Sequence, residues 1–181
     1  MKKITENRPI AWVVLALVVL GSLFIGGGNV IAGRAGQVSD LFFKTEDGVY
    51  EMLGEMADEA EIMASLAQNS DGADMAQVGV VSEQVETLRA SKSVAECGAA
   101  VTGMTTAIEN LYSGLDRMGL SEADASEFRY QYKNYKDVLM IVDREDDAYN
   151  SAAEEFNAMR GGFPAGLISA VRGIGEAELF R

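Results

Sequence analysis

The residues best suited to chemistry form a run of carboxylates in the last third of the chain. This run consists of Asp143, Glu145, Asp146 and Asp147. Hard divalent cations take several oxygen ligands, so the run could bind such an ion together with Glu154 or Glu155. Asp146 also falls on an apolar helical stripe, where a carboxylate needs a partner or water. A structural interpretation therefore stands beside the metal site: Asp146 lies at an irregularity of the packing and reaches solvent or a basic side chain.

A second acidic group follows the spacing of one helix face. Its members are Glu51, Glu55, Asp58, Glu59 and Glu61. Steps of three and four residues bring the first three to one side of a helix. We interpret this group as a solvated face and not as a ligand site.

The usual groups of nucleophilic catalysis are scarce. The chain has no histidine and one cysteine, Cys97, which lies on an apolar stripe. A thiol without a histidine lacks its usual base, so a small buried residue is the simpler interpretation. Carboxylate pairs alone can catalyse hydrolysis, but they need a cleft, and a simple helical bundle offers few. We therefore expect no enzyme activity, no metal and no cofactor.

The charge of the chain excludes one class of partner. The formal net charge is −13. Residues 1–32 hold three of the 15 basic side chains and one of the 28 acidic ones, so residues 33–181 are still more negative. An anionic surface repels phosphate backbones, and nucleic-acid binding is not expected.

The N-terminal segment has the length and composition of a membrane anchor. Residues 10–31 contain no charged side chain, and 22 helical residues cover about 33 Å, close to the hydrocarbon thickness of a bilayer. Lys2, Lys3 and Arg8 precede this run, and the positive-inside rule then places the N-terminus in the cytoplasm and the rest outside. The alternative is a cleaved signal peptide with its small-residue site at 30–32.

Elements beyond the anchor are expected to be helices. Apolar residues recur every three or four positions in four segments, which begin near Val38, Val78, Val94 and Phe128. Turn signals separate them at 69–72, 91–93 and 119–121. The last segment runs about forty residues, to Gly161. Short connections favour antiparallel neighbours, so the sequence predicts an all-α chain: a transmembrane helix followed by an antiparallel four-helix bundle.

The C-terminal part contains two aromatic–asparagine pairs one heptad apart. Tyr149 and Asn150 are followed by Phe156 and Asn157. The spacing turns both rings to the core and sets both asparagines beside the seam, either to hydrogen-bond a neighbouring helix or the C-terminal segment, or to form a partner-docking groove. Residues 163–174 predict a short amphipathic helix that folds back on the bundle or lies on a membrane surface.

The order of these residues resembles the C-terminal signature of the LemA family. The similarity comprises the two pairs above, then Phe163-Pro164, a small apolar stretch and Leu179-Phe180. Members of that family have a short N-terminal membrane anchor and a helical bundle. The first bundle segment departs from the family pattern, since residues 44–68 contain neither proline nor arginine. The resemblance implies a fold and a location, because the family has no agreed activity.

Together these observations predict three parts. Residues 1–32 form the cytoplasmic N-terminus and transmembrane anchor, residues 33–160 the bundle, and residues 161–181 a C-terminal amphipathic segment packed on it. The expected function is a non-catalytic, membrane-anchored interaction or scaffold module of the bacterial cell envelope. Its partners would be the membrane and other envelope proteins or a second copy. An acidic sensor that binds a divalent cation or ligand is the alternative.

Overall fold

The computed structural model describes residues 8–44 and 48–181, and all regular structure in them is helical. The helices are α1 (Arg8–Phe43), α2 (Val49–Gln68), α3 (Met75–Ala90), α4 (Val94–Ser113), α5 (Glu122–Gly161) and α6 (Ala165–Arg172), with a short 3-10 turn, η1 (Leu115–Arg117), after α4. The predicted all-α class with an N-terminal apolar helix and a helical bundle is confirmed. The chain divides into two compact units, one of residues 8–38 with 154–177, the other of residues 39–153 with 178–181.

α1 is long and apolar enough to cross a membrane. Its side chains from Ala11 to Leu20 are all exposed, with Trp12 at 70% and Leu17 at 64% exposure. The exposed apolar surface of such a helix is expected to be covered by apolar groups that its own chain does not supply. The helix continues past the predicted anchor and ends only at Phe43, so the first predicted bundle segment is divided between α1 and α2. Lys2 and Lys3, on which the predicted orientation rests, lie outside the described residues.

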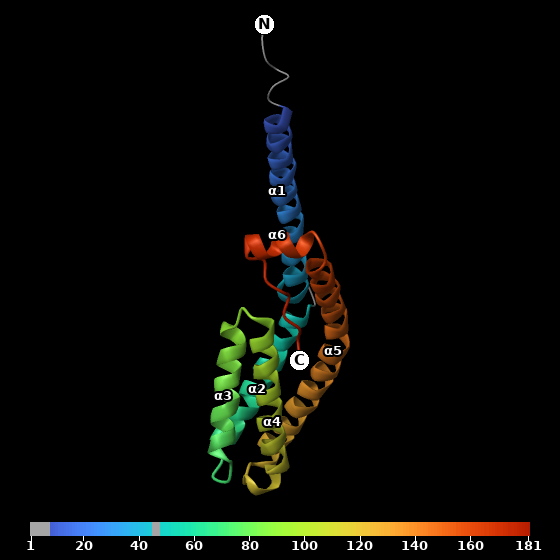
Figure 1. Ribbon diagram of the computed structural model, residues 1–181. Coiled ribbons are helices and arrows are strands. Elements are labelled where there is room, and N and C mark those ends of the chain that lie inside the picture. Colours follow the sequence, from blue (N-terminus) through green and yellow to red (C-terminus); the bar gives the residue numbers. More distant parts are fainter. Residues whose placement is uncertain (1–7, 45–47) are drawn as a thin grey trace. The chain divides into compact units, whose positions relative to one another are not determined.

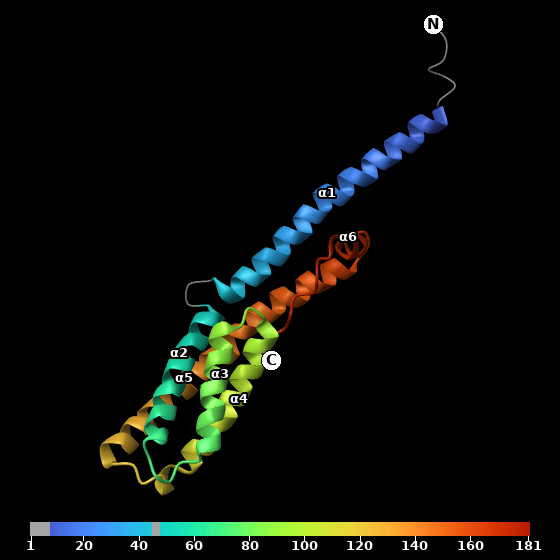
Figure 2. The same ribbon diagram turned by 90° about the vertical axis from the view of Figure 1, so that its left-hand side faces the viewer.

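The bundle consists of α2, α3, α4 and the first part of α5, which lie side by side (Figure 1). Side-chain contacts show the antiparallel order of neighbouring helices. Tyr50, at the start of α2, reaches the carbonyls of Leu88 and Arg89 at the end of α3. The ring of Tyr112 in α4 stacks on Tyr132 in α5 with a centroid separation of 3.8 Å. Figure 2 shows the same helices from the side.

Local signals set the ends of the helices. Asp74 accepts from the backbone of Ala76 and Gln77 at the start of α3, as expected for an N-cap. Ser93 caps α4 by accepting from the backbone N–H of Glu96, while the Glu96 carboxylate accepts from Ser91, so only half of a capping box forms. Gly54 does not interrupt α2. Gly119 has a φ of +69°, but α4 ends earlier, at Ser113.

The bundle core is built from the predicted apolar stripes. Its largest fully buried side chains include Phe42, Leu53, Met104, Phe128 and Tyr135. The Tyr135 hydroxyl lies 2.6 Å from the Thr105 hydroxyl, which satisfies both groups inside the core. Burial of this apolar surface supplies most of the driving force for the fold.

The C-terminal segment is divided between the two units. α6 belongs to the same unit as the first part of α1 and crosses that helix (Figure 1). Ile168 lies against Gly27, and Arg172 lies against Gly28 and donates to the Asn29 side chain over 3.2 Å. Glycine has no Cβ, so α6 can approach α1 closely here. Residues 178–181 belong instead to the unit that contains the bundle.

One acidic side chain of α2 departs from the predicted solvated face. Glu59 is half-buried, and one of its carboxylate oxygens has no hydrogen-bond partner. Burial, and then the charges of Glu55, Asp137 and Asp58, together raise the pKa of Glu59 to about 7. The folded state therefore favours protonated Glu59, so its contribution to stability is complete at low pH and is lost as pH rises through about 7.

Removing this charge is expected to flatten the pH dependence of stability. Between pH ~5 and ~8 the full chain in detergent micelles should lose about 1–2 kcal/mol of unfolding free energy relative to Glu59→Gln, after allowance for solvent screening. Urea unfolding followed by circular dichroism measures both profiles. Glu86→Gln, which removes an exposed carboxylate of α3, is the matched control. Parallel profiles for the wild type and Glu59→Gln would contradict the expectation.

Candidate functional site

The tail, residues 174–181, is held by side chains of α5. In the bundle unit, Asn150 forms a pair of hydrogen bonds with one residue: its amide nitrogen donates to the Phe180 carbonyl over 3.0 Å, and its oxygen accepts from the Phe180 N–H over 2.9 Å. The Tyr149 hydroxyl donates to the Glu178 carbonyl over 2.7 Å. Burial and the nearby Glu178 charge raise the pKa of Tyr149 to about 12, so the hydroxyl remains a donor.

These bonds insert the ring of Phe180 into an aromatic cluster. The Phe42 ring lies at the centre, 5.1 Å from Tyr149 and 5.5 Å from Phe180 between centroids. Phe43 and Tyr50 extend the cluster along its other side. Aromatic pairs at these separations stabilise a core beyond the area they bury. The tail thus completes the packing around the end of α1 that lies in the bundle unit.

Two further contacts tie the tail to α4. The Glu178 carboxylate accepts from the Ser93 hydroxyl and from the Ala95 N–H, over 2.7 and 3.1 Å. A carboxylate at a helix N-terminus satisfies open donors, and these bonds lower the pKa of Glu178. A Cβ at position 98 would overlap the backbone of Arg181, so Gly98 permits the close approach of the last residue.

The other unit repeats the arrangement. Asn157 donates to the Ala177 carbonyl over 2.9 Å and accepts from the Ala177 N–H over 2.8 Å. Arg160 donates to the Ile174 carbonyl over 2.8 Å and pairs with the Glu176 carboxylate over 3.1 Å. Gly173 follows the last residue of α6 in the left-handed conformation, φ +66°, which glycine adopts without strain, and the tail starts after it. We call the contacts of Tyr149, Asn150, Asn157 and Arg160 with residues 174–181 the tail clamp.

The spacing of the two asparagines matches the spacing of their partners. Seven residues separate Asn150 from Asn157, a helical rise of about 10.5 Å. Three residues separate Ala177 from Phe180, and an extended chain covers about 10 Å in three residues. The tail has no regular structure, so its backbone N–H and C=O groups lack the partners that a neighbouring strand would supply. The two asparagines, one heptad apart on α5, supply those partners instead.

The structure brings together only part of the predicted C-terminal motif. Tyr149, Phe156 and Phe180 are buried, and Asn150, Asn157 and Leu179 are half-buried. Phe163 and Pro164, by contrast, are exposed, and Phe163 is exposed to 91%. Sequence reasoning did not identify Arg160 and Glu178 as parts of the tail clamp. No periodic signal marks them, because their partners lie in irregular chain or across the bundle.

The acidic run does not form a ligand cluster. Asp143, Glu145 and Asp147 are exposed, and Asp146 is half-buried. Burial, and then the charges of Asp147 and Asp143, raise the pKa of Asp146. Across residues 8–44 and 48–181, no group of three or more metal-ligating side chains gathers. Cys97 is fully buried, and burial raises the pKa of its thiol, which disfavours the nucleophilic thiolate.

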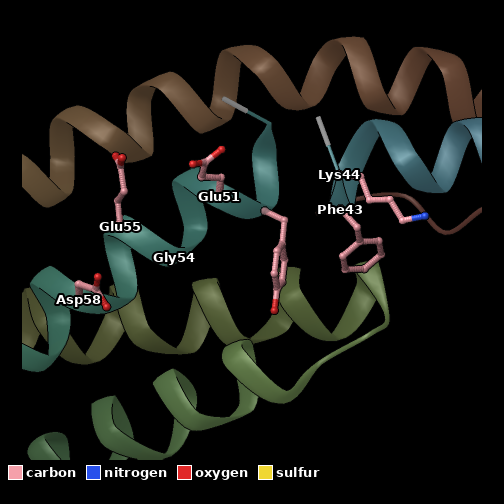
Figure 3. A pocket seen from close by; sticks show the side chains of 7 residues that line it. Phe43, Lys44, Glu51, Gly54, Glu55 and Asp58 are labelled. Atoms are coloured by element: carbon pink, nitrogen blue, oxygen red, sulfur yellow. The ribbon is translucent and has the colours of Figure 1, made fainter. Parts of the chain in front are cut away.

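The outer side of α2 carries two hollows that share Asp58. The first has about 580 Å³ and is lined by Phe43, Lys44, Tyr50, Glu51, Gly54, Glu55 and Asp58. Figure 3 shows Glu51 and Glu55 projecting from α2 above Gly54, with Lys44 at the far end. The second has about 380 Å³ and is lined by Asp58, Glu61, Ile62, Ser65 and Leu66. Residues 51–66 on this side, which we call the α2 face, thus combine carboxylates with an exposed isoleucine.

No known protein family, curated protein or solved structure matches the chain.

Loss of one asparagine should release the tail. Asn150→Ala removes both bonds to Phe180 and leaves two half-buried backbone groups without partners, so the unfolding free energy should fall by about 2 kcal/mol. Urea unfolding of the full chain in detergent micelles measures the change, and carboxypeptidase should trim the variant faster.

Asn134→Ala, on the same helix but four turns away, is the matched control and should cost less than about 0.5 kcal/mol. Equal losses for the two variants would contradict the assigned role of Asn150.

Proposed function

We propose that this chain is a membrane-anchored, LemA-like envelope protein whose bundle is a non-catalytic interaction module. The observation that carries the proposal is α1, a helix with the length of a span and exposed apolar side chains, followed by an acidic bundle. The resemblance of the C-terminal residues to the LemA signature supports the same layout. The excess of basic residues before the span favours a cytoplasmic N-terminus and an extracytoplasmic bundle.

A non-catalytic role agrees with the side chains present. The chain contains no histidine, and its one thiol is buried. The most specific polar contacts, those of the tail clamp, are made between protein groups and hold the chain's own end. Groups that are already paired in this way stabilise a fold and leave little capacity for chemistry on a substrate.

The α2 face is the surface we assign to a protein partner. Ile62 is 42% exposed between the carboxylates of Asp58 and Glu61, which also pair with Arg89 of α3. An apolar centre with a charged rim is typical of a docking surface. The chain carries a net charge of −13, so a second copy would be repelled and a basic, partly apolar segment of another envelope protein would be attracted.

The anchor is tested by extraction of membranes. The full chain should remain with the membrane fraction after high-salt and alkaline washes and should be released by detergent with its N-terminal segment intact. Val18→Arg places a charge in the middle of the span, at a cost of about 2.5–3.5 kcal/mol, and should sharply reduce membrane retention, whereas Val18→Leu should not. Recovery of a soluble wild-type chain without its first thirty or so residues would overturn the anchor.

The docking surface is tested by photocrosslinking in intact cells. A photoreactive amino acid at position 62 or 66 should yield one defined adduct with a basic protein, and raised ionic strength should weaken it in isolated membranes. The matched control is position 75, because Met75 is an exposed apolar residue of α3. Adducts of the same kind and yield at position 75, or none at 62 and 66, would contradict the assignment.

A further inference from the structure

α6 leaves an apolar face uncovered. Phe163, Leu167 and Val171 are exposed to 91%, 53% and 67%. Leu167 and Val171 are spaced by four and lie on one side of α6, and Phe163 is exposed in the turn just before the helix. The adjoining side of α6 is occupied, because Ile168 and Ser169 are buried and Ile168 lies against Gly27 of α1. These three exposed residues, which we call the α6 face, are therefore uncovered, while the adjoining side of α6 is packed against α1.

The place where α6 meets α1 identifies what covers this face. α6 contacts α1 at Gly27, Gly28 and Asn29. A span that begins at Ile10 reaches a depth of about 30 Å by residue 29, which is the thickness of the hydrocarbon core. α6 therefore lies where the uncharged run of α1 leaves the bilayer, at the level of the lipid headgroups.

The orientation of α6 relative to α1 also agrees with a position at the level of the lipid headgroups. α6 runs across α1 and not along it, as Figure 1 shows. A helix that crosses a spanning helix at the headgroup level lies in the plane of the membrane, as amphipathic interfacial helices do. Arg172, at the end of α6, is held at Asn29 by a hydrogen bond, at the position where a cation can remain in water.

We propose that α6 is an interfacial helix, whose face of Phe163, Leu167 and Val171 inserts into the outer edge of the bilayer beside α1. This proposal rests on the proposed anchor. The α6 face is covered by the acyl-chain region of zwitterionic lipid. Anionic lipid is not required, because this part of the chain presents apolar side chains and few cations. Partial insertion of three apolar side chains adds a second attachment and restrains rotation of α1 in the membrane.

Tryptophan quenching in vesicles tests the proposal with the full chain. The chain has one tryptophan, Trp12, in the span. The double variant Trp12→Phe/Phe163→Trp, reconstituted in phosphatidylcholine vesicles, moves the only tryptophan to the α6 face. Lipids brominated near the headgroup end of the acyl chain should reduce its emission about twofold and more than deeply brominated lipids do. Trp12→Phe/Leu167→Trp is a second reporter on the same face.

Trp12→Phe/Tyr130→Trp is the matched control, since Tyr130 is 59% exposed on α5, and its emission should not change. If the reporters at 163 and 167 are as insensitive to bromine as the one at 130, the interfacial helix is refuted. A blue-shifted but unquenched reporter also refutes it, because protein and not lipid then covers the face. Quenching of Trp12 in the unmodified chain distinguishes failure of the anchor from failure of the interfacial helix. If brominated lipids quench Trp12, the anchor stands whatever the α6 reporters show. If they do not, both the anchor and the interfacial helix are refuted.

Discussion

Two asparagine side chains hold the end of this chain, and the placement of residues 174–181 depends on them. Each pairs with both backbone groups of one tail residue, Asn150 with Phe180 and Asn157 with Ala177. A chain end without regular structure has many open donors and acceptors, and here the side chains of a helix satisfy them. In the bundle unit this places Phe180 against Phe42 and Glu178 at the start of α4. In the other unit it fixes the chain that follows α6.

The bundle is acidic, and its stability depends on its apolar core. Repulsion among carboxylates destabilises a compact state. Fully buried side chains such as Phe42, Phe128 and Tyr135 offset it. Glu59 is a carboxylate that the fold does not keep fully charged. Its pKa of about 7, raised mainly by burial, leaves it partly protonated near neutral pH. Glu178 shows the opposite case, because hydrogen bonds from the Ser93 hydroxyl and the Ala95 N–H lower its pKa.

Helical periodicity was enough to predict most of the fold. The stripes that begin at Val78, Val94 and Phe128 became α3, α4 and α5, and the end of α5 near Gly161 was predicted correctly. The stripe that begins at Val38 is divided, because α1 continues to Phe43 and Gly48 starts a new helix. Periodicity cannot tell a span that stops at the membrane from one that continues beyond it. The pairing of Asn150 and Asn157 with the tail was foreseen as one of two interpretations, whereas the partners of Arg160 and Glu178 lie outside any periodic pattern. The contact of α6 with Gly27 and Gly28 was not foreseen either, since it joins segments about 140 residues apart whose sequences share no signal.

Hydrogen exchange of two backbone amides tests the role of the tail clamp most directly. The N–H groups of Ala177 and Phe180 each donate to an asparagine oxygen, over 2.8 and 2.9 Å. In the detergent-solubilised full chain, both amides should exchange at least about 100-fold more slowly than those of an unstructured peptide. Exchange at the unstructured rate, while the amides of α4 remain protected, would contradict the account.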